Sequence, residues 1–186
     1  MVHIGIILGS TRPGRNGKAV AQWAYDRAVQ RGDAGYELVD ITDFALPMLD
    51  EPMPPIMGKY THHHTRAWSE KIASFDGYVF VTPEYNRSTS GALKNAIDYL
   101  YSEWTNKAAG FIGYGSHGGT RAVEHLRLIM GELQVADVRT QVSLGMMTDF
   151  ANYRDFKPQP HQATTLHAML DQVVSWSQAL SGLRAA

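Results

Sequence analysis

The chain has 186 residues, of which 44% are hydrophobic and 19% charged, and its net charge is -1 at neutral pH. These values are ordinary for a globular domain and exclude the strongly basic surface of a general nucleic-acid binder. The chain contains no cysteine, which excludes disulfides and cysteine-ligated metal centres, so any redox chemistry needs a bound cofactor. No apolar stretch is long enough to cross a bilayer, and the first residues lack the basic start of a signal peptide. We therefore expect one cytoplasmic domain over residues 1–186.

Short apolar runs alternate with longer segments of helical periodicity, which is typical of βαβ units around a parallel sheet. The predicted strands are residues 3–8, 36–41, 77–81, 108–114 and 138–144. Helices are predicted to end near residues 31 and 75, to span residues 91–104, and to contain residues 122–133 and 166–180. Four prolines between residues 47 and 60 argue against regular structure there. This alternation predicts a doubly wound α/β fold with a five-stranded parallel sheet.

Three loops that follow predicted strands are rich in glycines and hydrogen-bond donors. In open α/β sheets, ligands bind beyond the carboxyl ends of the strands, where the strand order reverses. In the strand order 2-1-3-4-5, the first, third and fourth strands are neighbours. We therefore expect the loops after these strands to form one site.

The first of these loops spans residues 9–17 and reads Gly-Ser-Thr-Arg-Pro-Gly-Arg-Asn-Gly. It combines hydroxyl groups, two guanidinium groups and a helix N-terminus, which predicts a phosphate site. It lacks the Gly-Lys-Ser/Thr of a P-loop. The alternative is an ordinary turn with two solvated arginines.

The second loop spans residues 82–91, in which Ser88, Thr89 or Ser90 could cap the next helix. Capping leaves Glu84-Tyr85-Asn86 unexplained, and such a turn could hydrogen-bond the edge of a planar heterocycle. The third loop, residues 113–118, matches Gly-x-Gly-x-x-Gly. A dinucleotide fingerprint of this kind belongs to the first βα turn of a fold, so we favour a glycine loop that approaches a ligand closely.

Residues 82–100, Thr-Pro-Glu-Tyr-Asn-Arg-Ser-Thr-Ser-Gly-Ala-Leu-Lys-Asn-Ala-Ile-Asp-Tyr-Leu, resemble the signature of the NAD(P)H-dependent FMN reductases. That family has a flavodoxin-like fold and includes quinone, azo-dye and chromate reductases. Residues 9–12 resemble its phosphate loop and residues 115–121 its second glycine loop, so the resemblance runs from the first strand to about Gly145. The chain departs from many members at Ser90, where they have proline, and at Arg15 and Gly17.

The resemblance implies a three-layer flavodoxin-like domain that binds FMN and uses NADPH or NADH as co-substrate. The FMN phosphate would lie in the first loop and the flavin ring against residues 83–86. The expected cofactor-binding residues are Ser10, Arg12, Arg15, Asn16, Gly17, Pro83, Glu84, Tyr85, Asn86, Ser88, Ser116, His117 and Gly118. Hydride would pass between nicotinamide and flavin, so no side chain is expected as nucleophile or metal ligand.

The implied acceptor is a small molecule: a quinone, an azo compound, a metal oxyanion or free flavin. The family also implies a homodimer or homotetramer, with no membrane or nucleic-acid partner. Two other functions are an electron carrier like flavodoxin and a supplier of reduced flavin to a monooxygenase. Carriers of that kind are usually strongly acidic, which this chain is not.

Some other residues have two interpretations. His62-His63-His64 suggest a metal site, but consecutive helical side chains point about 100° apart, which favours a polar helix start. His117 is either a proton donor or a solvated loop residue. Met48, Met53 and Met57 either cover a planar substrate or pack on the core. Tyr101 and Trp104 could belong to a dimer interface.

Overall fold

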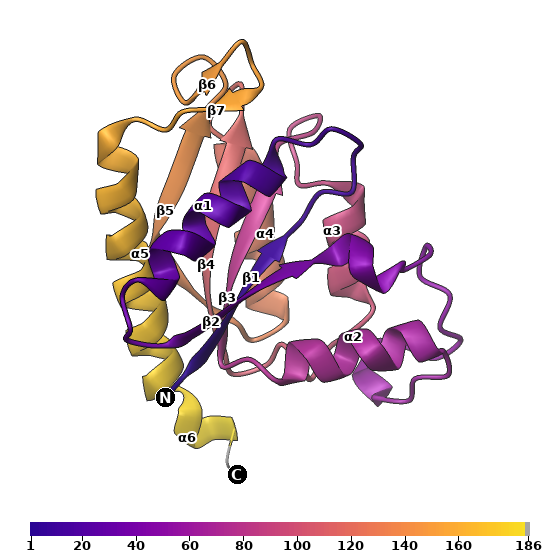
Figure 1. The fold of residues 1–186 in the computed structure, drawn as a ribbon. Helices are drawn as coiled ribbons and strands as arrows, with labels where there is room; N and C mark the ends of the chain where they lie inside the picture. The colour runs from indigo at the N-terminus through magenta and orange to yellow at the C-terminus, as the bar shows by residue number, and fades with distance from the viewer. Residues whose placement is uncertain (185–186) are drawn as a thin grey trace.

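The computed structural model describes residues 1–184 and contains one five-stranded parallel sheet. Its strands are β1 (His3–Leu8), β2 (Gly35–Asp40), β3 (Gly77–Pro83), β4 (Ala108–Gly115) and β5 (Ala136–Gly145). They are arranged in the order β2-β1-β3-β4-β5 (Figure 1). The predicted order is confirmed. Every residue of β3 is buried, because helices cover both faces of the sheet.

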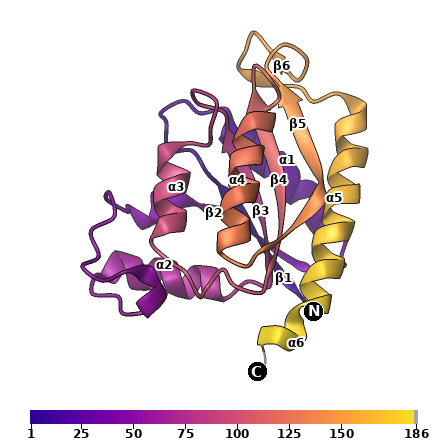
Figure 2. The same ribbon diagram turned by 180° about the vertical axis from the view of Figure 1, so that it is seen from behind.

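Two layers of helices enclose the sheet, as Figures 1 and 2 show from opposite sides. Helices α1 (Gly17–Val29) and α5 (Pro160–Ala179) cover one face, and the short α6 (Ser181–Arg184) follows α5. Helices α2 (His63–Ala73), α3 (Gly91–Asp98) and α4 (Thr120–Glu132) cover the other. The core beneath α2 to α4 is rich in large aromatic side chains, namely Trp68, Phe75, Tyr78, Phe80, Trp104 and Phe111.

Helix α3 ends at Asp98, so the predicted helix over residues 91–104 is too long. Two tryptophans donate hydrogen bonds to backbone carbonyl groups that a longer helix would use for its own backbone hydrogen bonds. Trp68 Nε1 donates to Ala96 O at 2.8 Å, and Trp104 Nε1 donates to Ile97 O at 3.2 Å. Both indole rings are fully buried, so their N–H groups must find partners inside the protein. Tertiary packing thus ends this helix early.

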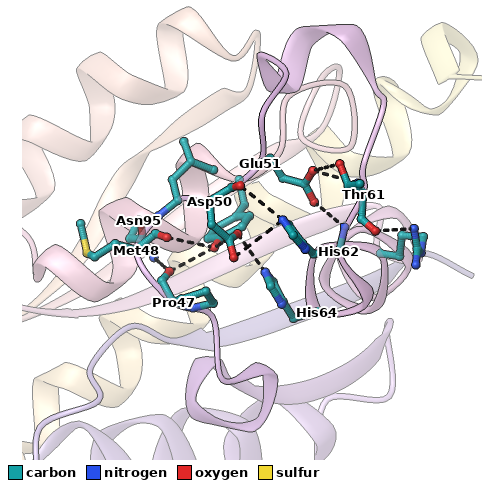
Figure 3. A network of polar contacts seen from close by, with 11 residues as sticks. Pro47, Met48, Asp50, Glu51, Thr61, His62, His64 and Asn95 are labelled. Atoms are coloured by element: carbon teal, nitrogen blue, oxygen red, sulfur yellow. Dashed lines mark hydrogen bonds and ion pairs between the residues drawn. The ribbon is translucent and has the colours of Figure 1, made fainter.

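The proline-rich segment between β2 and α2 is mostly irregular, as predicted, but it contains the 3₁₀ helix η2 (Pro55–Met57). A second 3₁₀ helix, η1 (Ile41–Phe44), directly follows β2. Side chains from α3 and from its C-cap residue hold the segment by its backbone. Asn95 Nδ2 donates to Pro47 O at 2.7 Å, and the Tyr99 hydroxyl donates to the same oxygen at 3.1 Å (Figure 3).

The histidine run forms a polar start of α2, as predicted, with His63 and His64 inside the helix and His62 just before it. His62 is the N-cap and has an extended backbone, so its ring stacks on that of His64 at 5.2 Å. Both rings face Asp50, with His64 Nε2 at 3.1 Å from Oδ1 and His62 Nε2 at 3.9 Å from Oδ2 (Figure 3). Residues 1–184 contain no cluster of three or more His, Cys, Asp or Glu arranged to hold a metal ion.

A small hairpin follows β5 and was not predicted. Its strands are β6 (Phe150–Ala151) and β7 (Asp155–Phe156), and their antiparallel pairing projects the connecting turn above the sheet (Figure 1). Pro160, expected in a loop, is instead the first residue of α5, a position that suits its fixed φ angle. Within residues 1–184, none of the helices has the length and apolar character needed to span a bilayer.

Candidate functional site

A cleft of about 340 Å³ lies at the carboxyl ends of β3, β4 and β5, beside the loop that follows β1. Parallel strands bring these ends to one edge of the sheet, which is where open α/β folds bind ligands. All three loops predicted to converge contribute to the cleft, together with the new hairpin. The lining residues are Arg12, Pro13, Gly14, Arg15, Asn16, Pro83, Glu84, Tyr85, Tyr114, Gly115, Ser116, Met146, Tyr153 and Arg154.

The loop after β1 presents one arginine to the cleft and holds the other in place. Arg12 is exposed, and its side chain forms no hydrogen bond or ion pair within residues 1–184. Arg15 is largely buried, donates to Ser10 O and pairs with Asp40 at the end of β2. Its charge therefore already has a partner. Arg12 is the guanidinium of this loop that remains available to an anion.

The N-terminus of α1 closes one end of the cleft without a side-chain cap of its own. The N-cap residue Asn16 makes no capping bond, and its Nδ2 instead donates to Tyr153 O at 2.9 Å. An uncapped helix start favours negative charge, because its first N–H groups and the helix dipole point outward. The helix start and Arg12 thus favour the same kind of ligand.

A tyrosine hydroxyl lies buried at the base of this loop. A Cβ atom at Gly17 would stand 2.4 Å from the Tyr114 hydroxyl, so only glycine allows the helix to start against this ring. The hydroxyl is buried beside Ser10 and the start of α1, and no group within residues 1–184 meets it with good hydrogen-bond geometry. Burial raises the pKa of the Tyr114 phenol above its ordinary value, so the group stays a donor. A buried donor without a partner beside a cleft is suited to a polar ligand.

The loop after β3 forms a tight turn that is tied to the first loop. Tyr85 and Ser88 exchange backbone hydrogen bonds of 2.9 and 3.1 Å. Between them, Asn86 and Arg87 have positive φ angles of 47° and 74°. Ser90 proves to be the cap of α3: its Oγ accepts from Leu93 N at 3.0 Å and donates to Gly9 O. One hydroxyl therefore links two of the three loops.

An ion pair links the loop after β3 to the first turn of α4. Arg121 Nε donates to Glu84 Oε1 at 2.6 Å, and Arg121 N donates to Oε2 at 3.1 Å. The Glu84 side chain is only 3% exposed. Burial raises the pKa of this carboxyl, but the Arg121 guanidinium and N–H outweigh burial and bring the pKa below its ordinary value. Glu84 is therefore a neutralised structural carboxylate.

The same arginine fixes the ring of His117. Arg121 Nη2 lies 3.0 Å from His117 Nδ1. Arginine has no acceptor, so Nδ1 must accept this bond and a neutral ring carries its proton on Nε2. His117 is exposed and lies outside the cleft lining.

The predicted site residues divide into three groups. Those that line the cleft are Arg12, Arg15, Asn16, Pro83, Glu84, Tyr85 and Ser116. Ser10 and Gly17 are buried beneath it, and the Ser10 hydroxyl lies 3.1 Å from that of Tyr85. The residues that stand outside the lining are Asn86, Ser88, His117 and Gly118.

Sequence reasoning missed seven lining residues: Pro13, Gly14, Tyr114, Gly115, Met146, Tyr153 and Arg154. Four of them lie within the quoted glycine-rich loops, so loop membership could have identified them. Met146, Tyr153 and Arg154 follow β5, where the sequence carries no motif. Their position depends on how β5 and the hairpin pack.

A second hollow of about 520 Å³ lies between the first loop, η1 and α3. Its lining is largely apolar and includes Leu46 and Met48 but no arginine or lysine. Met53 and Met57 line neither this hollow nor the cleft. Among the three methionines considered as a lid, only Met48 borders a hollow, and that hollow lacks the charge that a phosphate requires.

Comparison with known proteins assigns the family. The model of the NADPH-dependent FMN reductases matches residues 2–149. The chain belongs to this family. It is accordingly an oxidoreductase with FMN as cofactor and NAD(P)H as co-substrate.

Similar proteins are found among fungi and bacteria. An NAD(P)H-dependent FMN reductase of Schizosaccharomyces pombe is 42% identical over 77% of this chain and 73% of its own. A 2-hydroxy-1,4-benzoquinone reductase of a Burkholderia species is 33% identical, over 72% and 73% of the respective chains. The solved structure of the flavoenzyme NAD(P)H:(acceptor) oxidoreductase FerB of Paracoccus denitrificans covers 96% of this chain and 98% of its own. It superposes with a TM-score of 0.73 at 22% identity, which supports the shared fold.

Proposed function

We propose that the protein transfers electrons from NADPH or NADH through FMN to a small-molecule acceptor by a ping-pong mechanism. The acceptor is a quinone, an azo compound, a metal oxyanion or free flavin. The observation that carries the proposal is the cleft at the carboxyl ends of β3 to β5, which joins a positively charged first loop to a donor-rich turn. We further propose that the enzyme works in the cytoplasm.

The charges of the cleft suit a flavin mononucleotide. Glu84 is the one acidic side chain of the lining, and Arg121 neutralises it. Arg12 and the start of α1 would hold the phosphate, while Pro83, Tyr85 and Ser116 would contact the flavin ring. Bound FMN would supply the redox chemistry between the nicotinamide and the acceptor. The protein contributes position and fixed hydrogen-bond donors.

Two features support a small acceptor over a partner protein. Relatives are named as quinone and azo reductases, including an FMN-dependent NADPH-azoreductase of Staphylococcus saprophyticus at 29% identity. Electron carriers usually dock to their partners through a strongly acidic surface, and this chain has a net charge of only -1. An electron carrier and a supplier of reduced flavin are the alternatives.

Anaerobic stopped-flow mixing tests the activity. Protein loaded with FMN should lose the visible absorbance of its oxidised flavin on mixing with NADPH or NADH, at a rate that saturates with nicotinamide concentration. Little direct reduction by either nicotinamide would identify an electron carrier. Turnover with quinone, azo dye and free FMN as acceptors then separates a quinone-type reductase from a flavin supplier.

The ping-pong order follows if nicotinamide and acceptor occupy one cleft in turn. Double-reciprocal plots at several fixed acceptor concentrations should then be parallel. Lines that intersect would show that both substrates bind together, and the shared cleft would be wrong.

We propose that the protein forms a homodimer, or a homotetramer built from such dimers. Trp104, considered as an interface residue, is fully buried in the core and cannot serve, whereas the half-buried Tyr101 lines a groove between α3 and α4. Leu128 borders this groove and is 78% exposed. Leu128→Glu should therefore yield a smaller species by light scattering, because a buried charge in an apolar interface is costly. An unchanged mass would place the interface elsewhere.

A further inference from the structure

The hairpin after β5 brings an arginine to the cleft that no sequence motif predicts. Arg154 lies in the turn between β6 and β7 and lines the cleft together with Tyr153. Asn152 and Tyr153 have φ angles of 52° and 59°, which few side chains adopt. Such a backbone persists only where surrounding contacts enforce it.

The hairpin is firmly attached to the body of the protein. The buried carboxylate of Asp149 accepts from Gly145 N and Gln159 N, both at 2.9 Å, and so ties both ends of the segment together. The rings of Phe150 and Phe156 lie 5.2 Å apart in a tilted arrangement, and Phe156 forms a T-shaped pair with Trp23 of α1 at 5.6 Å. The turn is thus held in place by apolar and polar contacts.

The turn is also joined to the proposed phosphate loop. Asn16 Nδ2 donates to Tyr153 O at 2.9 Å, which places the hairpin against the start of α1. The N-cap side chain is therefore used to hold the hairpin and not to cap its own helix. This contact sets Arg154 beside the loop that carries Arg12.

The three arginines that line the cleft, Arg12, Arg15 and Arg154, differ in whether they already have a partner. Arg15 is committed to Asp40, and Glu84 to Arg121. Arg12 and Arg154 are exposed, and within residues 1–184 neither side chain has a hydrogen bond or ion pair. Two guanidinium groups without a carboxylate, in one cleft, provide the donors and charge that a phosphate monoester binds.

We propose that Arg154 is a phosphate-binding residue, which contacts the 5′-phosphate of FMN from the hairpin while Arg12 contacts it from the first loop. The inference rests on the proposed function. It adds a residue outside the segment that matches the family model, which ends at residue 149. It also explains how this chain compensates for an Arg15 that is engaged by Asp40.

The test is a fluorescence titration of apoprotein with FMN and with riboflavin, which lacks the phosphate. Arg154→Ala should raise the Kd for FMN by about tenfold or more and leave that for riboflavin unchanged. Arg154→Lys should retain part of the FMN affinity, because it keeps the charge but loses bidentate bonding. Arg139→Ala is the matched control, since Arg139 is an exposed arginine on β5 outside the cleft.

Each other outcome overturns the assignment. An unchanged FMN affinity in Arg154→Ala, or equal losses for both flavins, would show that Arg154 does not contact the phosphate. A raised KM for NADPH but not for NADH, with normal FMN affinity, would instead assign Arg154 to the 2′-phosphate of NADPH. If the unaltered protein itself bound no FMN, the proposed function would fail, which is a different result.

Discussion

Arg12 and Arg15 stand three positions apart in one loop, but their guanidinium groups have different surroundings. Asp40 lies at the end of the neighbouring strand β2 and pairs with Arg15 but not with Arg12. Residue type therefore does not decide which arginine can meet a ligand. The deciding feature is the carboxylate of Asp40, which the register of β1 and β2 places beside Arg15.

Glu84 links the loop after β3 to α4 through its ion pair with Arg121, and the proposed reaction does not need it as a reactive group. Glu84→Gln keeps the shape of the side chain but removes the charge that Arg121 pairs with. Because the pair is largely buried, we expect the free energy of unfolding to fall by about 2 kcal/mol. FMN and riboflavin should both bind more weakly, since the change touches no phosphate. Urea unfolding and flavin titration measure the two effects.

Glu124→Gln serves as the control, because Glu124 is an exposed carboxylate on α4 with no hydrogen bond or ion pair within residues 1–184. If Glu84→Gln unfolded at the same urea concentration as this control, the ion pair would contribute nothing measurable. A selective loss of FMN affinity would mean instead that Glu84 acts on the phosphate site.

The end of α3 depended on side-chain contacts, one of them distant in sequence. The apolar stripe of residues 91–104 predicted one long helix, yet Trp68 from α2 and Trp104 take the carbonyls that end α3. The hairpin of β6 and β7 gave no periodic signal, because each strand has two residues. Propensity and periodicity describe neighbours along the chain and carry no information about such partners.

The start of α2 gives the protein a measurable dependence on acid pH. Glu51 accepts hydrogen bonds from Thr61 N at 2.8 Å and from His62 N at 2.9 Å (Figure 3). Burial raises the pKa of Glu51, but the donors around it outweigh burial and lower the pKa to about 2. A lowered pKa in the folded state stabilises the protein above the unfolded value, near 4.3, and this stability is lost as the pH falls toward 2.

Glu51→Gln should therefore unfold at a lower urea concentration than the unaltered protein at pH 7. This difference between the two unfolding midpoints, the gap, should narrow between about pH 5 and pH 2. Glu70→Gln, an exposed position on α2 whose side chain has no partner within residues 1–184, should show no such gap. A gap for Glu51→Gln that stayed constant with pH would contradict the assignment of this stability to the ionised carboxylate.

For the molecule as a whole, the strand order 2-1-3-4-5 is confirmed, and the three glycine-rich loops meet in one cleft as it predicts. Residues of the three glycine-rich loops meet because β1, β3 and β4 are adjacent in the sheet. The family signature in residues 82–100 then identified the ligand class. The lining after β5 could not be predicted. Met146 N donates to Gly115 O, and Arg154 reaches the cleft through the packing of the hairpin against Trp23 and Tyr114.

The central claim is that this cleft binds FMN by its phosphate, and one titration tests it most directly. Apoprotein carrying Arg12→Ala is titrated with FMN and with riboflavin, and the unaltered protein is titrated in parallel. A hydrogen bond to a charged group contributes roughly 1.5–3 kcal/mol, so the Kd for FMN should rise about ten- to a hundredfold while that for riboflavin stays the same. Equal losses for both flavins, or no loss for either, would mean that the phosphate lies elsewhere and that the cleft has been misassigned.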